Sequence, residues 1–109
     1  MTEITIYKNR EGAFLGFDCL GHAGYADAGE DIVCAGISAL VINTVNAVEQ
    51  YTGQPHTTEA DEKSGEIRLR FTSPVEHDAE LLMKSMVLGL RGIQNNYGNR
   101  FIHLRFEEV

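Results

Sequence analysis

Cysteine and histidine are scarce in this 109-residue sequence, which contains two cysteines and four histidines. The histidines are scattered, and a metal site needs more ligands at closer spacing, so we expect neither a metal nor another cofactor. Cys19 and Cys34 lack the C-x-x-C spacing of redox motifs, and we expect both to be free thiols in a reducing compartment. A redox pair formed by these two residues stays open as an alternative.

Basic side chains are also in the minority. Nine lysines and arginines stand against sixteen aspartates and glutamates, which gives a formal net charge of −7. Such a surface repels the phosphates of nucleic acids, so we expect no direct binding of nucleic acid. It instead attracts a basic partner, although a net negative charge also serves simply to keep a small protein soluble.

Long apolar runs, repeats, linkers and low-complexity segments are missing too. We identify no run of the length needed to cross a bilayer, and the chain opens with a strand pattern rather than a basic and apolar signal. We therefore expect a cytoplasmic protein that makes no membrane contact. The length and the ordinary hydrophobic fraction of 43% favour one folded domain over residues 1–109.

The spacing of apolar residues predicts five strands and two helices. The expected strands are 2–9, 13–20, 56–62, 66–72 and 101–106, and the expected helices are 32–51 and about 74–97. This β-β-α-β-β-α-β order predicts an α+β fold, in which a mixed, mostly antiparallel sheet has both helices packed on one face.

Three local patterns refine this expectation. Gly16, inside the second strand, indicates a bulge or a close backbone contact. Ser73, Pro74 and Glu76 form a capping-box pattern that predicts the start of the second helix. In that helix we expect a broad buried surface, made of Leu81, Leu82, Met86, Leu88, Leu90 and Ile93.

The stretch 20–40 carries the most chemical interest, because a loop rich in glycine and alanine with His22 leads into an apolar helix with Cys34. Asp31 stands directly before the helical run and is the predicted N-cap. Cys34 would then be the third helical residue, where the helix field favours a thiolate and free backbone N–H groups can receive an oxyanion. His22 is a candidate base, so these are the parts of a Cys–His nucleophilic site.

Each of these residues also has a simpler interpretation. A lone helix cysteine is usually a small buried apolar residue, and a lone loop histidine is usually solvated. Asp31, Cys34 and Ser38 share one helix face by their spacing, so Ser38 either lines a site beside Cys34 or bonds back to the helix backbone. Spacing alone leaves both interpretations open.

The segments GHAGYA, which begins at Gly21, and DIVCAGISAL, which begins at Asp31, resemble the ribosomal-processing cysteine protease family Prp. The resemblance covers essentially the whole chain, and the twelve-residue separation of His22 and Cys34 matches as well. It implies a cysteine endopeptidase that removes a short N-terminal extension from a bacterial large-subunit ribosomal protein, number twenty-seven, and so supports ribosome assembly. Cleavage would follow a hydrophobic, phenylalanine-containing sequence.

The resemblance also implies roles for individual residues and partners. Cys34 would be the nucleophile, and His22 the general base and then the acid. Asp31, Ser38, Gly21 and Tyr25 are supporting or substrate-site candidates, and Tyr25 and Ile37 are candidates for an apolar lining. The implied substrate is a basic ribosomal protein precursor, and the implied assembly is a homodimer. Two other classes stay open, namely a non-catalytic ribosome-associated binding module and a redox switch of Cys19 with Cys34.

Overall fold

The computed structural model describes residues 2–20, 28–61 and 63–109, and within them the side chains of all but 28–31. Within these residues, five strands and two helices follow one another in the order β-β-α-β-β-α-β. They are β1 (Thr2–Lys8), β2 (Phe14–Leu20), α1 (Ala28–Tyr51), β3 (His56–Asp61), β4 (Glu66–Phe71), α2 (His77–Tyr97) and β5 (Ile102–Glu108).

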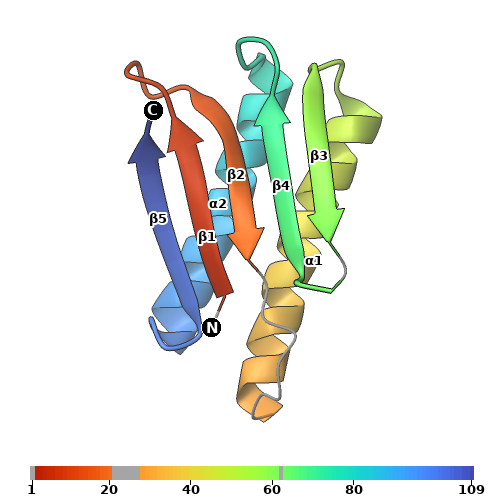
Figure 1. The fold of residues 1–109 in the computed structure, drawn as a ribbon. Helices are drawn as coiled ribbons and strands as arrows, with labels where there is room; N and C mark the ends of the chain where they lie inside the picture. Colours follow the sequence, from red (N-terminus) through yellow and green to blue (C-terminus); the bar gives the residue numbers. More distant parts are fainter. Residues whose placement is uncertain (1, 21–27, 62) are drawn as a thin grey trace.

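The strands form one sheet in the order β3-β4-β2-β1-β5. β5 runs parallel to β1, and the other neighbouring strands are antiparallel. Both helices lie on the same face of this sheet, while no described segment covers the other face, called the uncovered face below (Figure 1). The predicted α+β fold, its element order and its single helical face are therefore confirmed.

The core lies between the sheet and the two helices. Alternation along β1 turns Ile4 and Ile6 toward the helices, where both are fully buried. The expected buried surface of α2 is wrong in part, because Leu81 and Leu88 are 58% and 74% exposed. Leu81 lies two positions before the buried Met83, and Leu88 lies two positions before the buried Leu90. Two helical steps of 100° place each leucine on the opposite side of α2 from its buried neighbour.

The start of α1 differs from the prediction. The helix begins at Ala28 rather than at Ile32, so Asp31 is its fourth residue and is not the N-cap. Alanine and glutamate, at positions 28 and 30, are good helix formers and extend the helix toward the N-terminus in spite of Gly29.

The start of α2 differs as well. The helix begins at His77 with Glu76 as N-cap, and the predicted capping box does not form. A distant side chain replaces it, since the Gln54 amide oxygen accepts the Glu76 backbone N–H at 2.7 Å. Gln54 is only 3% exposed, and its amide nitrogen lies 3.3 Å from the Ser73 hydroxyl. This buried glutamine therefore satisfies a helix-end donor that the local sequence leaves unpaired.

Gly16 marks an irregularity between β1 and β2, as predicted. The pairing register shifts between Tyr7 and Lys8, opposite this part of β2. Gly16 has a φ of +147°, and a Cβ at this position would lie 2.1 Å from the Leu69 carbonyl oxygen. Only glycine therefore allows β4 to approach β2 this closely.

One segment of α1, Ile32–Tyr51, is long and apolar enough to span a membrane by length and composition, with a mean hydropathy of 1.6. The expectation that no apolar run reaches this length is thus wrong. Scattered polar residues such as Thr44 interrupt the run, but the mean hydropathy of the segment stays high. Val33, Ile37 and Val41 are at most 2% exposed and pack in the core. Packing against the sheet accounts for part of this composition, since 33% of the segment is buried inside the structure.

Candidate active site

Cys34 lies in the second turn of α1, close to the first residue of β1. Its thiol is partly buried and free, and its sulfur lies 3.7 Å from the Thr2 hydroxyl oxygen. Thr2 is 2% exposed, so the hydroxyl faces the helix layer and not the solvent. The sequence interpretation missed Thr2, although its even spacing from Ile4 and Ile6 places it on the buried face of β1.

The position of Cys34 within the helix changes one part of the predicted chemistry. Because α1 begins at Ala28, Cys34 is the seventh helical residue and not the third. The backbone N–H groups that lack helical partners belong to the first turn, before Cys34. The predicted donation of free N–H groups from the same turn as Cys34 is therefore wrong, and the helix field at the sulfur is weaker than in the first turn.

Several predicted site residues cannot be placed. His22, Gly21 and Tyr25 lie outside the described residues, and for Asp31 the structure describes the helical backbone only. The structure therefore neither joins nor separates His22 and Cys34.

The three described histidines have other polar neighbours. Nδ1 of His56 lies 2.7 Å from the Gln54 carbonyl oxygen. Nδ1 of His77 lies 3.1 Å from an Asp78 carboxylate oxygen. In His103, Nδ1 lies 3.9 Å from a Glu3 carboxylate oxygen, on the uncovered face of the sheet. Each of these rings thus has a partner away from Cys34, and the described residues contain no group of three or more potential metal ligands.

Cys19 is the second thiol, and its environment differs from that of Cys34. It lies on the core side of β2 and is 4% exposed. Burial raises the pKa of the Cys19 thiol from 9.0 to about 11, and the nearby Cys34 adds to this rise. Because the thiolate is the reactive form, Cys19 is a poor nucleophile at neutral pH.

Ser38 lies one helical turn beyond Cys34 and lines a cavity of about 310 Å³ between α1 and the β3–β4 turn. Ile42 and Ile67 give this cavity apolar walls, and Asp61 and Glu66 bring carboxylates to it. We call it the α1–β4 cavity. Ile37 does not contribute an accessible lining, since it is 1% exposed and belongs to the core.

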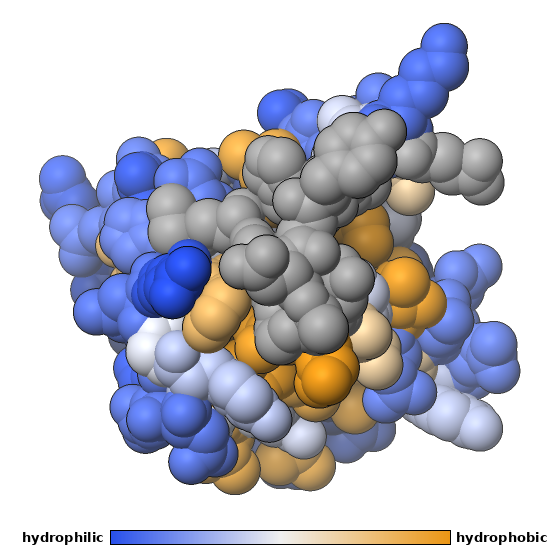
Figure 2. All heavy atoms as spheres, turned by 90° about the horizontal axis from the view of Figure 1, so that it is seen from below, coloured by the Kyte–Doolittle hydropathy of each residue, from blue (hydrophilic) through white to orange (hydrophobic). Residues whose placement is uncertain are grey.

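The end of the molecule where α1 begins carries apolar surface. Figure 2 shows hydrophobic side chains gathered on this end among polar ones. At the end of β2 Leu20 is 42% exposed, and in the first turns of α1 Ile32 is 66% exposed. Accessible apolar side chains therefore lie on the elements that flank Cys34.

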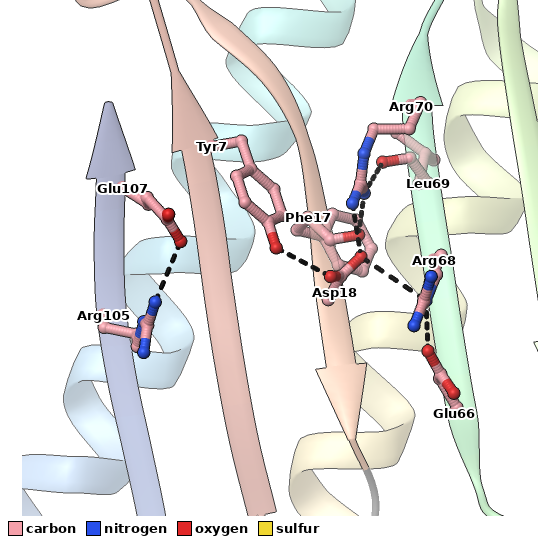
Figure 3. Close-up of polar contacts among 9 residues, drawn as sticks. All are labelled: Tyr7, Phe17, Asp18, Glu66, Arg68, Leu69, Arg70, Arg105 and Glu107. Carbon is pink, nitrogen blue, oxygen red and sulfur yellow. Dashed lines mark hydrogen bonds and ion pairs between the residues drawn. The ribbon is translucent and has the colours of Figure 1, made fainter. Parts of the chain in front are cut away.

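A polar cluster on the uncovered face connects the three central strands (Figure 3). The Tyr7 hydroxyl of β1 donates to the Asp18 carboxylate of β2 at 2.8 Å, and this bond raises the pKa of Tyr7. Arg70 of β4 contacts the same carboxylate at 2.7 Å and lies over the Tyr7 ring, 4.4 Å from its centroid. The cluster joins the strands whose opposite face carries Thr2 and Cys19.

Comparisons with known proteins give one consistent family. The sequence profile of the family described as cysteine protease Prp matches residues 1–102. The ribosomal processing cysteine protease Prp of Bacillus subtilis (strain 168) is 32% identical over 101 residues, which cover 89% of this chain and 90% of the relative.

Solved structures agree with this match. The essential ribosomal processing protease Prp from S. aureus, in complex with a substrate peptide, has a TM-score of 0.90 and 30% identity, covering 98% of this chain and 100% of that one. A structure of that protease with a covalently linked product peptide has a TM-score of 0.87 and 31% identity, with the same coverage.

Proposed function

This chain belongs to the Prp family of ribosomal processing cysteine proteases, and on that premise we propose that Cys34 is its nucleophile and His22 its general base. The observation that carries the proposal is the contrast between the two thiols. Cys34 is partly accessible beside a hydroxyl group, whereas Cys19 is buried and has a raised pKa.

The proposed reaction follows the chemistry of a Cys–His pair. His22 takes the proton of the Cys34 thiol, and the thiolate attacks the carbonyl carbon of the scissile bond. The tetrahedral intermediate expels the amine, which receives the proton from His22, and a thioester remains on Cys34. A water molecule, deprotonated by His22, then hydrolyses this thioester and frees the thiol.

We propose that the substrate is the N-terminal extension of the basic large-subunit ribosomal protein number twenty-seven, cleaved after a hydrophobic, phenylalanine-containing sequence. The α1–β4 cavity supports this proposal, because its apolar walls suit a hydrophobic side chain one helical turn from Cys34. Its carboxylates, together with the net charge of −7, favour a basic segment next to that side chain.

The supporting roles are assigned within the same proposal. Ser38, Tyr25 and Gly21 belong to the substrate site, and Asp31 orients His22. The protein acts as one domain over residues 1–109, as a homodimer in the cytoplasm, and needs no cofactor.

Peptide cleavage tests this proposal. The purified chain is incubated with a peptide that spans the extended N-terminus of the ribosomal protein, and the products are identified by mass spectrometry. We expect one cut after the phenylalanine-containing sequence, with its rate reduced at least about a thousandfold in Cys34→Ala and in His22→Ala. Matched controls are Cys19→Ala and His77→Ala, which remove the same side-chain types elsewhere and should keep most of the activity.

The other outcomes separate the alternatives. A cut that survives Cys34→Ala contradicts the proposed nucleophile. Complete absence of cleavage by the folded wild-type protein favours the binding-module alternative. Loss of activity in Cys19→Ala as complete as in Cys34→Ala, in a variant that remains folded, favours the redox alternative.

A further inference from the structure

A second hollow lies at the other end of the molecule, between α2 and the strands β1 and β5. Its volume is about 420 Å³, and α2 contributes Lys84, Leu88 and Arg91 to its wall. Lys8, at the end of β1, and Phe106 of β5 face them. We call this hollow the α2–β5 groove.

The α2–β5 groove is separate from the candidate active site. Cys34 contacts Thr2 at the first residue of β1, whereas the groove is reached at Lys8, the last residue of that strand. Six strand steps of about 3.3 Å place these two residues about 20 Å apart. No residue of α1 lines the groove among the parts of the chain that the structure describes.

Aromatic rings hold two of the cations that face the groove. The Lys8 ammonium nitrogen lies 4.7 Å from the centroid of Phe14 and 5.2 Å from that of Phe106. The Arg91 guanidinium carbon lies 5.1 Å from the Phe106 centroid. These are cation–π distances, and they position both positive groups while leaving their hydrogen-bond donors available to an anion.

This arrangement differs from that of three arginines on the uncovered face of the sheet. Arg68, Arg70 and Arg105, on the uncovered face of the sheet, each lie within 4.0 Å of a carboxylate. Within residues 2–20, 28–61 and 63–109, Lys8 and Arg91 have no carboxylate at that distance. The charges of Lys8 and Arg91 are therefore not neutralised in the way that the charges of these three arginines are.

The groove also presents apolar surface beside these charges. Leu88 is 74% exposed and Phe106 is 41% exposed. Lys84 adds a third cation, and Glu80 contacts it at 3.2 Å. Among the described residues that line the groove, Glu80 is the one carboxylate. An excess of positive charge thus gathers on apolar walls, in a chain whose net charge is −7.

We propose that the α2–β5 groove binds a small organic anion, with a carboxylate or phosphate group carried on an aromatic or other apolar body. The anionic oxygens contact Lys8 and Arg91, and the apolar body lies against Leu88 and Phe106. The volume of about 420 Å³ falls within the roughly 300–1,000 Å³ usual for small-molecule sites. A polyanion such as a nucleic acid is disfavoured, because the net charge of −7 repels its further phosphates.

Titration of the ¹⁵N-labelled full chain, followed by amide chemical shifts at constant ionic strength, tests this proposal. The probes are phenyl phosphate, benzoate, inorganic phosphate and the uncharged benzyl alcohol. We expect saturable shifts with phenyl phosphate or benzoate, centred on the α2 and β5 residues that line the groove. Tighter binding of phenyl phosphate identifies a phosphate as the preferred group, and tighter binding of benzoate identifies a carboxylate.

Variants separate a specific site from general attraction between charges. Arg91→Gln should weaken binding about three- to tenfold, as expected for the loss of one charge-assisted contact. Its matched control, Arg105→Gln, removes an arginine from the uncovered face and should leave the affinity unchanged, as should Cys34→Ala. The proposal is overturned if benzyl alcohol binds as well as the anions, if no shift saturates, or if Arg91→Gln and Arg105→Gln have equal effects.

Discussion

Raising the pH should destabilise the protein through Cys19 in particular. Burial raises the pKa of this thiol from 9.0 to about 11 in the folded chain, while the unfolded chain keeps the ordinary value. The buried thiol therefore contributes stability that is complete below pH 9 and is lost as the pH rises toward 11. Two pKa units correspond to about 2.7 kcal/mol in total, of which about 1.4 kcal/mol is lost by pH 10.

A comparison of the wild type with Cys19→Ala isolates this contribution, because all other titrating groups are common to both. The free energy of unfolding is measured by urea denaturation at pH 8 and pH 10. At pH 8 the variant should be less stable, because it loses buried sulfur contacts in the core. At pH 10 this deficit should be smaller by about 1.4 kcal/mol, since only the wild type loses the stability of a buried neutral thiol.

A stability difference that is the same at both pH values would refute this reasoning, since it would mean that the folded Cys19 titrates normally. Alkylation provides a second readout at pH 8. A pKa of about 11 leaves roughly 0.1% of Cys19 as thiolate, against about 10% for an ordinary thiol of pKa 9.0. Iodoacetamide should therefore modify Cys19 at least about a hundredfold more slowly in the folded than in the unfolded chain.

Three substitutions test other features of the structure. Gly16→Ala should lower the free energy of unfolding by about 3 kcal/mol or more in urea denaturation, because its Cβ meets a backbone oxygen at 2.1 Å; a loss below about 1 kcal/mol contradicts this. Gln54→Ala should cost about 1–3 kcal/mol by leaving the Glu76 N–H unpaired, and unchanged stability argues against the capping role. Thr2→Val keeps the side-chain shape but removes the hydroxyl beside Cys34, so kcat/KM for peptide cleavage should fall about three- to tenfold with a changed pH profile; an unchanged profile contradicts a positioning role.

Much of the fold could be predicted from the sequence, because strand alternation and helical spacing are local signals. The alternation of Ile4 and Ile6 fixes which face of β1 is buried, and Gly16 marks a close strand approach. The start of α2 could not be predicted in this way. Gln54 lies far from Glu76 in the sequence, and only the folded chain brings the two together.

In the candidate site too, some features follow from local sequence signals and others from contacts that only the folded chain makes. Residue types and spacing are sufficient to propose His22 and Cys34 as candidates, because a base and a thiol on neighbouring segments have a recognisable chemistry. Spacing alone does not favour this interpretation over a buried cysteine and a solvated histidine. The contact of Cys34 with Thr2 depends on how α1 packs over the start of β1, which no spacing within the sequence reports. The different environments of the two thiols depend on the same packing.

The most direct test of the proposed nucleophile is to find where the acyl group forms during turnover. The protein is mixed with the substrate peptide, quenched in acid within the first turnovers and mapped by mass spectrometry. The proposed mechanism predicts the mass of the N-terminal cleavage product on Cys34, in the wild type and in Cys19→Ala alike. An acyl group on Cys19, or full peptide cleavage by Cys34→Ala, would contradict it.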